Sequence, residues 1–256
     1  MKVKFISLNI YEGWLLFDNV LQFLNEENPD IVAFQEVMDG KDKSLDRNIR
    51  TIEELKSFFT DWNYYFAPEF MLDDDGLKVE IGNAIFSKFP LMKTWSTDFG
   101  ISYGKFDVNP PNGDFSTHPK NIQCCEVDIK GQIHTVCNLH GIWGLDGGDN
   151  SARLKMSEII VQHIKDKDKV ILSGDFNLKP NTQAIKNIEK YLTNVFKDEL
   201  KSSFNLKRKN LEKFPGYATA VVDMLFVSSD INLSSHRCPQ VDVSDHLPLV
   251  CEFEVN

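Results

Sequence analysis

Short runs of β-branched and other apolar residues dominate the chain, and several of them stop abruptly at polar side chains. Such runs, when Gly, Pro, Asn or Asp bound them, predict buried strands. Lys130-Gly131-Gln132 separates two of the runs and predicts a tight hairpin. We expect strands at residues 3–9, 31–36, 64–66, 84–87, 122–129, 133–139, 170–173, 221–228 and 249–255.

Helical periodicity occupies a few segments between these runs. Residues 97–120, by contrast, carry scattered Gly, Pro and aromatic residues and predict a long irregular loop, of a kind that often binds a ligand. Hairpins with few helices predict an α/β fold of the α+β type, with largely antiparallel or mixed sheets covered by helices. No repeat or linker divides the chain, so we expect one domain over residues 1–256. Helices are expected at 16–27, 45–59 and 151–164, the last capped by Asn150 or Ser151.

The overall charge limits the partners of the protein. The 256 residues, 42% of them hydrophobic, suffice for a large core, but the formal net charge of −10 disfavours binding nucleic acid by bulk electrostatics. One basic stretch, residues 201–213, either borders a polyanionic substrate or forms a solvated surface, and the second interpretation is the more common. No apolar run approaches the length of a membrane span, so we expect no stable membrane association.

The cysteines predict a reducing compartment. They are odd in number, show no Cys-x-x-Cys spacing and lie mostly inside predicted strands, so we expect free, buried thiols. The amino terminus lacks the apolar core of a signal peptide, and a cytoplasmic location is therefore expected. The residues are Cys124, Cys125, Cys137, Cys238 and Cys251.

Polar motifs follow the predicted strands in a characteristic order. They are Asn9, Phe34-Gln35-Glu36-Val37, Gly82-Asn83-Ala84-Ile85-Phe86-Ser87, Asn138-Leu139-His140, Gly174-Asp175-Phe176-Asn177, Val222-Asp223-Met224-Leu225-Phe226-Val227-Ser228 and Ser244-Asp245-His246. This series resembles the endonuclease/exonuclease/phosphatase family, which includes pancreatic-type deoxyribonucleases, apurinic endonucleases, inositol polyphosphate phosphatases, bacterial sphingomyelinases and deadenylases. The series spans nearly the whole chain and is far more specific than any single motif. The resemblance implies a four-layered α/β/β/α sandwich with two central mixed sheets and one metal-dependent phosphoesterase site at the strand ends.

A metal ion is expected because the negative charge of a phosphoester repels an attacking water. Magnesium accepts one or two carboxylates and keeps several waters. Glu36, Asn9 and Asp245 are the candidate ligands, Asp245 in the inner or the outer coordination sphere. Manganese suits the same ligands, and the lack of a Cys/His cluster argues against structural zinc. The expected cofactor is therefore Mg²⁺, with Mn²⁺ as the alternative.

The resemblance also implies the catalytic residues. Asp175 would orient or deprotonate the attacking water, and the Asn177 amide would donate to a phosphate oxygen. Their spacing places both side chains on one face if the strand continues. His246, oriented by Asp223, would act either as a base or as a cation that binds the phosphate. His140 would lie on the side of the leaving group.

Two positions depart from the family pattern, which often has Arg where this chain has Val222 and Lys120. Because such arginines commonly contact phosphate, these changes put any transfer of substrate specificity in doubt. Trp143, Tyr103 and Trp14 are the candidate substrate contacts, although burial is the more frequent fate of a tryptophan. The other histidines, expected at the surface or in loops, are His118, His134, His163 and His236.

These features predict a divalent-metal-dependent hydrolase of phosphoesters that uses in-line attack by water, most consistent with a phosphodiesterase or nuclease. The alternative substrate is a phosphorylated lipid, sugar or other small molecule. A non-catalytic binding module of the same fold would lack at least one acid or histidine of the set, and every position is filled. A serine hydrolase is disfavoured because no Gly-x-Ser-x-Gly motif occurs.

Overall fold

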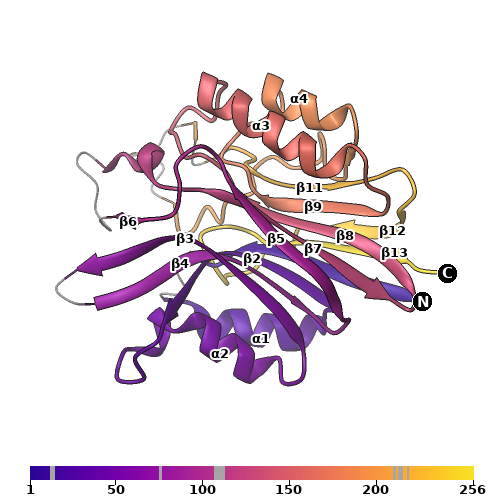
Figure 1. The fold of residues 1–256 in the computed structure, drawn as a ribbon. Coiled ribbons are helices and arrows are strands. Elements are labelled where there is room, and N and C mark those ends of the chain that lie inside the picture. The colour runs from indigo at the N-terminus through magenta and orange to yellow at the C-terminus, as the bar shows by residue number, and fades with distance from the viewer. Residues whose placement is uncertain (12–14, 75–76, 107–112, 210–211, 213–215, 218) are drawn as a thin grey trace.

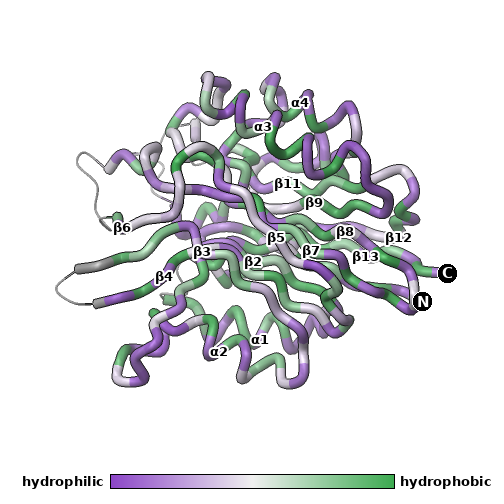
Figure 2. The backbone as a smooth tube through the Cα atoms, viewed as in Figure 1, coloured by the Kyte–Doolittle hydropathy of each residue, from purple (hydrophilic) through white to green (hydrophobic). Residues whose placement is uncertain are grey.

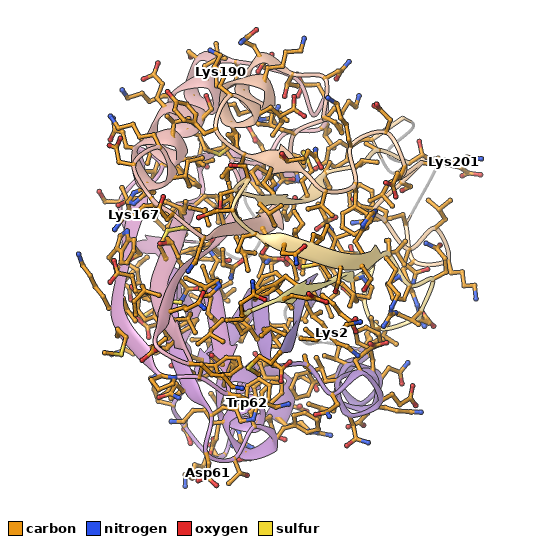
Figure 3. The ribbon with its side chains drawn as sticks, turned by 90° about the vertical axis from the view of Figure 1, so that its right-hand side faces the viewer. Lys2, Asp61, Trp62, Lys167, Lys190 and Lys201 are labelled. Atoms are coloured by element: carbon orange, nitrogen blue, oxygen red, sulfur yellow. A yellow bond between two sulfur atoms is a disulfide. The ribbon has the colours of Figure 1, made fainter. Side chains whose placement is uncertain are left out.

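The computed structural model describes residues 1–11, 15–74, 77–106, 113–209, 212, 216–217 and 219–256. The helices are α1 (Phe17–Glu27), α2 (Thr51–Phe58), α3 (Ser151–Ile164) and α4 (Gln183–Glu189). Two stacked β-sheets lie between them, with α1 and α2 outside one sheet and α3 and α4 outside the other (Figure 1). In the view of Figure 3, Lys190 and Asp61 mark opposite ends of this stack. The four-layered α/β/β/α sandwich is thus confirmed. No helix of the described ranges is long and apolar enough to cross a membrane.

Each sheet combines parallel and antiparallel pairs, as expected. Sheet A consists of β1 (Lys2–Asn9), β2 (Ile31–Gly40), β3 (Asn63–Asp74), β4 (Leu77–Ser87), β6 (Lys105–Phe106), β12 (Asn232–Arg237) and β13 (Leu249–Glu254), in the order β12-β13-β1-β2-β4-β3-β6. Sheet B consists of β5 (Leu91–Asp98), β7 (Asn121–Ile129), β8 (Gln132–His140), β9 (Val170–Asp175), β10 (Thr193–Asn194) and β11 (Asp223–Val227), in the order β10-β11-β9-β8-β7-β5. The pairs β1–β2, β3–β6 and β8–β9 are parallel.

Alternate residues of the central strands serve different hydrophobic cores. Phe5 of β1 lies in the core between the sheets, whereas its neighbour Ile6 packs with α1 and α2. In β9, Ile171 lies between the sheets and Leu172 packs with α3 and α4. Green stretches accordingly run along the strands in Figure 2, whereas the helices alternate between green and purple. Burial on both faces explains why these strands appear in the sequence as nearly continuous apolar runs.

The elements that the sequence did not reveal lie at the edges of the fold. β5 and β12 are edge strands with many exposed residues, so they lack the apolar run of a central strand. α4 was not among the expected helices. The helix expected at 45–59 is shorter, because a short 3-10 helix (Arg47–Ile49) precedes α2. For α3 the cap is Asn150, whose side chain accepts a hydrogen bond from the backbone N–H of Arg153.

The prediction of five free thiols is wrong for Cys124 and Cys137, which form a disulfide. They face each other directly across the β7–β8 hairpin, on the side covered by α3 and α4. The antiparallel register brings them together, although they are distant from each other in sequence. Cys125, Cys238 and Cys251 are free.

Candidate active site

Strand alternation carries the polar strand ends into the space between the sheets. Asp175 lies on the same face of β9 as the core residue Ile171, and Asp223 lies on the same face of β11 as Leu225. Asp175 has two register partners. They are Asp223 of β11 on one side and His140, at the end of β8, on the other. Adjacent strands of sheet B therefore place three titratable side chains next to one another.

A β-bulge in β2 turns Glu36 toward these residues. The pairing of β2 with β4 shifts between Phe34 and Val37, so that Gln35 and Glu36 together oppose one residue of β4. Regular alternation would point Glu36, like Phe34, toward the helices outside sheet A. The extra residue, with a φ of 56° at Glu36, interrupts the alternation and lets this carboxylate line the site.

A second bulge, on the other side of β4, positions Glu69. The pairing of β3 with β4 shifts between Pro68 and Phe70, which leaves Glu69 as the extra residue. Proline has no N–H to donate to a neighbouring strand. It is therefore tolerated at a bulge, where the ladder of hydrogen bonds is already interrupted. The Glu69 carboxylate is fully buried. Glu69 was not among the predicted site residues, because nothing in an apolar pattern marks a bulge.

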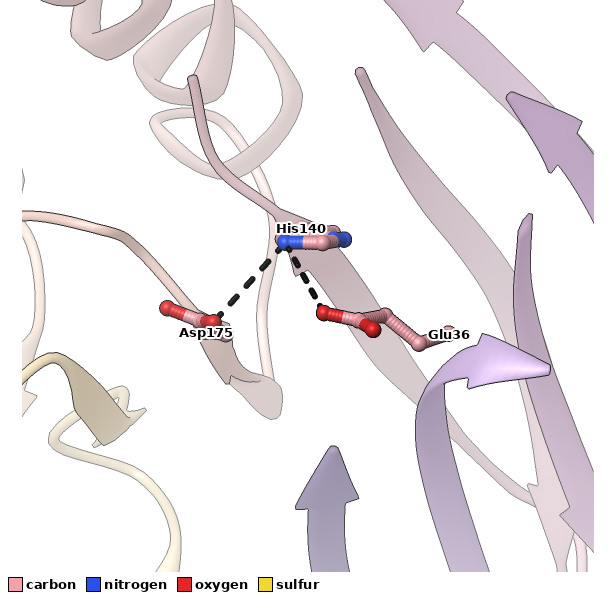
Figure 4. A group of neighbouring side chains, drawn as sticks. All are labelled: Glu36, His140 and Asp175. Carbon is pink, nitrogen blue, oxygen red and sulfur yellow. Dashed lines mark ion pairs between the residues drawn. The ribbon is translucent and has the colours of Figure 1, made fainter. Parts of the chain in front are cut away.

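One cavity of about 270 Å³ is lined by seven of the predicted residues, namely Glu36, His140, Trp143, Asp175, Asn177, Asp245 and His246. The Nε2 atom of His140 lies 3.7 Å from Oε1 of Glu36 and 3.8 Å from Oδ2 of Asp175 (Figure 4). The Asn9 amide donates to the same two carboxylates, at 2.9 and 3.3 Å. Residues from β1, β2, β8 and β9 therefore converge on one point between the sheets, as the sequence predicted.

Lys120 and Glu69 form a buried ion pair beside His140. The Lys120 Nζ atom lies 2.9 Å from Oε2 of Glu69 and 2.8 Å from Nδ1 of His140. An ammonium group can only donate, so Nδ1 of His140 accepts and its ring hydrogen is on Nε2, which faces Glu36 and Asp175. Burial favours the neutral form of Glu69, but the charge of Lys120 outweighs it and lowers the pKa of this carboxyl group.

Asp223 orients His246 through a hydrogen bond of 2.9 Å between Oδ2 and Nδ1. Burial opposes protonation of His246, but the carboxylates of Asp223 and Asp245 outweigh it and raise its pKa to about 9. The Nε2 atom of His246 lies 3.8 Å from Oδ2 of Asp175. Burial and the nearby Asp223 raise the pKa of Asp175 above its usual value, although the charge of His246 opposes this. At neutral pH, His246 is therefore an imidazolium.

Asn177 reaches the cavity by a turn and not by continuation of β9. The strand ends at Asp175, and Asn177 has a φ of 52°, so the strand does not continue as the spacing argument required. The Asn177 backbone N–H donates to Asp175, and its side-chain amide donates to the carbonyl of Gly141 at 3.1 Å. The Tyr217 hydroxyl donates to the Asn177 side-chain oxygen. Burial and the charge of Asp175 raise the pKa of Tyr217 well above its usual value, so it remains a donor.

Asp245 also lines the cavity, and its carboxylate forms an ion pair with Lys209. Burial opposes ionisation of Asp245, but His246 and Lys209 outweigh it and lower its pKa. The clusters of acids and histidines that the described residues form do not include Asp245. Lys209 comes from the basic stretch 201–213, for which a solvated surface was the more common interpretation, yet it lines the cavity.

The aromatic candidates lie in different places. Trp143 lines the cavity and makes an edge-to-face contact with Phe115, with ring centroids 5.7 Å apart. The described residues that line the cavity do not include Tyr103, whose hydroxyl donates to Glu80 at 2.9 Å. Trp14 lies outside the described residues.

Of the histidines expected at the surface or in loops, His118 lies in a loop and His134 in strand β8, and both are buried. His118 is 5% exposed, lines the cavity and packs edge-on against Phe70, with ring centroids 5.1 Å apart. His134 is 2% exposed and packs against Phe253. His118 lies in the segment expected to be an irregular ligand-binding loop, and part of that segment does reach the cavity.

The donor set fits a divalent cation. Glu36, His140 and Asp175 each offer one ligand atom, and these atoms lie within 4.8 Å of one another. Carboxylates held this closely favour a cation between them, and oxygen ligands suit a hard one. Because Lys120 donates to Nδ1 of His140, the hydrogen on Nε2 makes the carboxylates, and not the imidazole, the expected ligands.

A four-layered sandwich whose strand ends present carboxylates and imidazoles to one cavity has the architecture of a metal-dependent phosphoesterase. The model of the Endonuclease/Exonuclease/phosphatase family matches residues 6–246, and the chain belongs to this family. No curated protein sequence matches the chain.

Solved structures share the fold over essentially the whole chain. An endonuclease/exonuclease/phosphatase from Bacteroides vulgatus has a TM-score of 0.71 and 18% identity, and covers 100% of both chains. The mannosyl-6-phosphatase of Bacteroides thetaiotaomicron has a TM-score of 0.72 and 17% identity, covering 99% of this chain and 100% of its own. D. rerio TDP2, complexed with a single-strand DNA product, has a TM-score of 0.70 and 17% identity, covering 99% of both chains.

Proposed function

We propose that the protein hydrolyses phosphoester bonds by in-line attack of water on phosphorus, with the help of a divalent metal ion. The observation that carries this proposal is the convergence of Glu36, His140, Asp175 and the Asp223–His246 pair on one cavity. Membership of the family supports it. Two of the structurally similar proteins are consistent with it, namely the mannosyl-6-phosphatase and TDP2 in complex with a DNA product.

The proposed cofactor is Mg²⁺, with Mn²⁺ as the alternative. Glu36 would be its main ligand with Asp175 beside it, whereas the Asn9 amide nitrogen, which donates to both carboxylates, would orient them. Asp245 is proposed for the outer sphere, because Lys209 already pairs with its carboxylate. When bound, the cation would stabilise negative charge on the phosphate during the reaction.

The side chains of the cavity suit complementary roles. Asp175, whose pKa is raised by burial, suits accepting a proton from the attacking water. The imidazolium of His246 suits neutralising a non-bridging phosphate oxygen, which favours the cation role over the base role. Asn177 retains one amide hydrogen for the phosphate, and His140 directs an Nε2–H toward it.

The reaction balances as the hydrolysis of one ester bond. The water oxygen forms a bond to phosphorus, and one of its protons passes to Asp175. The bond from phosphorus to the leaving oxygen breaks on the opposite side, and that oxygen takes up a proton from water. The products are an alcohol and a phosphate, or a phosphomonoester where the substrate is a diester.

Hydrolysis of a panel of phosphomonoesters and phosphodiesters with Mg²⁺, Mn²⁺ or chelator tests the proposal. We expect turnover with metal and its loss with chelator, and a fall in kcat of about 10²–10⁴-fold for Asp175→Asn. Asp168→Asn is the matched control, because Asp168 is exposed and lies just before β9 begins, at the opposite end of the strand from Asp175. Chelator-resistant turnover, or equal rates for the two variants, would contradict the proposal.

A cytoplasmic location stays a prediction. It was based on the amino terminus and on five free thiols, and the Cys124–Cys137 disulfide, of a kind found mainly in oxidising compartments, argues against the second of these grounds.

A further inference from the structure

The cavity of the proposed active site has a charged side and an apolar side. The apolar side has no carboxylate or ammonium group. The only polar side-chain atoms of its described residues are ring nitrogens. We call it the apolar wall; it consists of Phe70, Leu72, Ile81, Phe115, His118 and Trp143. A substrate group bound there must be held by apolar and aromatic contact.

The apolar wall begins directly beside the catalytic groups. The Nζ atom of Lys120 lies 5.8 Å from the ring centroid of Phe70 and 2.8 Å from Nδ1 of His140. Phe70 also follows Glu69 in β3, at the bulge that positions this carboxylate. An ester oxygen bound next to His140 therefore has the apolar wall as its immediate neighbour.

The rings of the wall hold one another in place. Phe70 and Phe115 pack against His118, with ring centroids 5.1 and 5.3 Å apart, and Phe115 makes an edge-to-face contact with Trp143. Aromatic pairs at such distances are favourable beyond the burial of their area. The wall is therefore formed before any substrate binds.

A buried arginine fixes the backbone on both sides of Trp143. Arg153 of α3 is fully buried, and its Nε and Nη2 atoms donate to the carbonyls of Ile142 and Gly144 at 3.1 and 3.0 Å. A Cβ atom at Gly144 would lie 2.6 Å from Nη2, so glycine permits this close approach. Because the backbone on both sides of Trp143 is fixed in advance, binding against this residue costs less ordering entropy.

We infer that the substrate is a compact phosphoester whose leaving group carries an apolar ring, of the aryl or arylmethyl class, against Trp143 and Phe115. This inference rests on the proposed function. The cavity volume of about 270 Å³ accommodates one ring with its phosphoryl group. A polyhydroxylated ring fits less well, because each hydroxyl placed against the wall loses hydrogen bonds to water.

Benzyl phosphate and glucose 6-phosphate form a matched pair for the test, since both are phosphomonoesters of primary alcohols and differ in the ring. With Mg²⁺, we expect kcat/KM to favour benzyl phosphate on the order of a hundredfold. A preference for glucose 6-phosphate, equal values, or a much higher kcat/KM for an oligonucleotide would overturn the inference.

Variants of the wall separate its role from that of the catalytic groups. Trp143→Leu keeps apolar volume but removes the ring, and should reduce the preference for benzyl phosphate about tenfold, mainly through KM. Phe115→Leu should act in the same direction. Tyr191→Leu, at an exposed aromatic residue outside the cavity, should leave the preference unchanged. An unchanged preference in Trp143→Leu would contradict the inference.

Binding of benzylphosphonate, which cannot be hydrolysed, distinguishes failure of this inference from failure of the proposed function. Calorimetry with Mg²⁺ should show binding that Trp143→Leu weakens. If no ester is hydrolysed but this binding is found, the proposed function falls and the substrate class stands. If esters are hydrolysed without preference and benzylphosphonate does not bind, the proposed function stands and the substrate class falls.

Discussion

Replacement of Lys120 by Met removes the cation of a buried ion pair and leaves Glu69 charged where water cannot reach it. The two side chains are 7% and 0% exposed, and their charged atoms are 2.9 Å apart. The other oxygen of Glu69 keeps a hydrogen bond from Asn83 at 3.0 Å, but this amide does not neutralise the charge. Removing one partner of a buried pair typically costs about 3–5 kcal/mol, and we expect Lys120→Met to lose unfolding free energy of this size.

Lys155→Met supplies the matched control. The Lys155–Glu158 pair has a similar separation, 2.8 Å, but its side chains are 63% and 59% exposed. An exposed pair of this type contributes about 0.3–0.5 kcal/mol, so the difference between the two variants measures the effect of burial. Adding Glu69→Gln to Lys120→Met should recover part of the loss, because a neutral amide is less costly to bury than a carboxylate.

The pH dependence provides a second check on the same pair. In the wild type the pKa of Glu69 is lowered, so its stabilisation is present above the unfolded-state value and is lost as the pH falls through the folded-state value. Without Lys120, burial raises the pKa of Glu69. Protonation of Glu69 then makes the loss of unfolding free energy in Lys120→Met smaller at about pH 5 than at about pH 7. Urea denaturation at both pH values measures this. A loss no larger than that of Lys155→Met, or one that grows in acid, would refute the reasoning.

The other predictions concern the metal site, the imidazolium and the disulfide. Glu36→Gln should weaken Mg²⁺ binding in calorimetry and abolish turnover at an unchanged Tm, and full activity in Mg²⁺ would contradict the metal role. Asp223→Asn should lower the pKa of His246 from about 9, as followed by NMR. A raised pKa of His246 stabilises the fold fully below about pH 6.5 and progressively less up to about pH 9. This variant should therefore lose most stability at acidic to neutral pH. A titration of His246 still near 9 would exclude Asp223 as a cause of the raised pKa. Denatured, non-reduced protein should titrate as three thiols because Cys124 and Cys137 are joined, whereas five thiols would show that the disulfide is absent.

The sequence predicted the central strands and much of the site for the same physical reason. Strands buried on both faces need long apolar runs, and polar residues at their ends stand out against these runs. Asp175, Asp223 and His140 lie at ends of this kind, and neighbouring strands bring them together. Edge strands such as β5 bury less, so their sequence carries a weaker signal.

The residues that the sequence did not reveal depend on irregular backbone. Glu69 is in the middle of a strand and reaches the site only because β3 bulges there. Tyr217 and Lys209 lie in segments without regular secondary structure, where no periodicity indicates which way a side chain points. Lys120 was noted as a departure from the family pattern, but its contact with His140 depends on the position of Glu69.

The disulfide depends on the exact register of the hairpin. The expected three-residue turn Lys130-Gly131-Gln132 would pair Cys125 with Cys137, whereas the observed register pairs Ile129 with Gln132 and therefore Cys124 with Cys137. Spacing motifs such as Cys-x-x-Cys do not detect pairs that depend on hairpin register.

The pairing of β1 with β13 has a consequence for biosynthesis. Lys2 is the register partner of Glu254, so the first strand must wait for residues 249–254 to leave the ribosome before its place in sheet A is closed on that side. A nascent chain that has already emerged with Asn9 and Glu36 still lacks His246 and β13. We therefore expect catalytic competence to arise only after translation has passed these residues, and the early apolar strands to depend until then on chaperones for protection from aggregation.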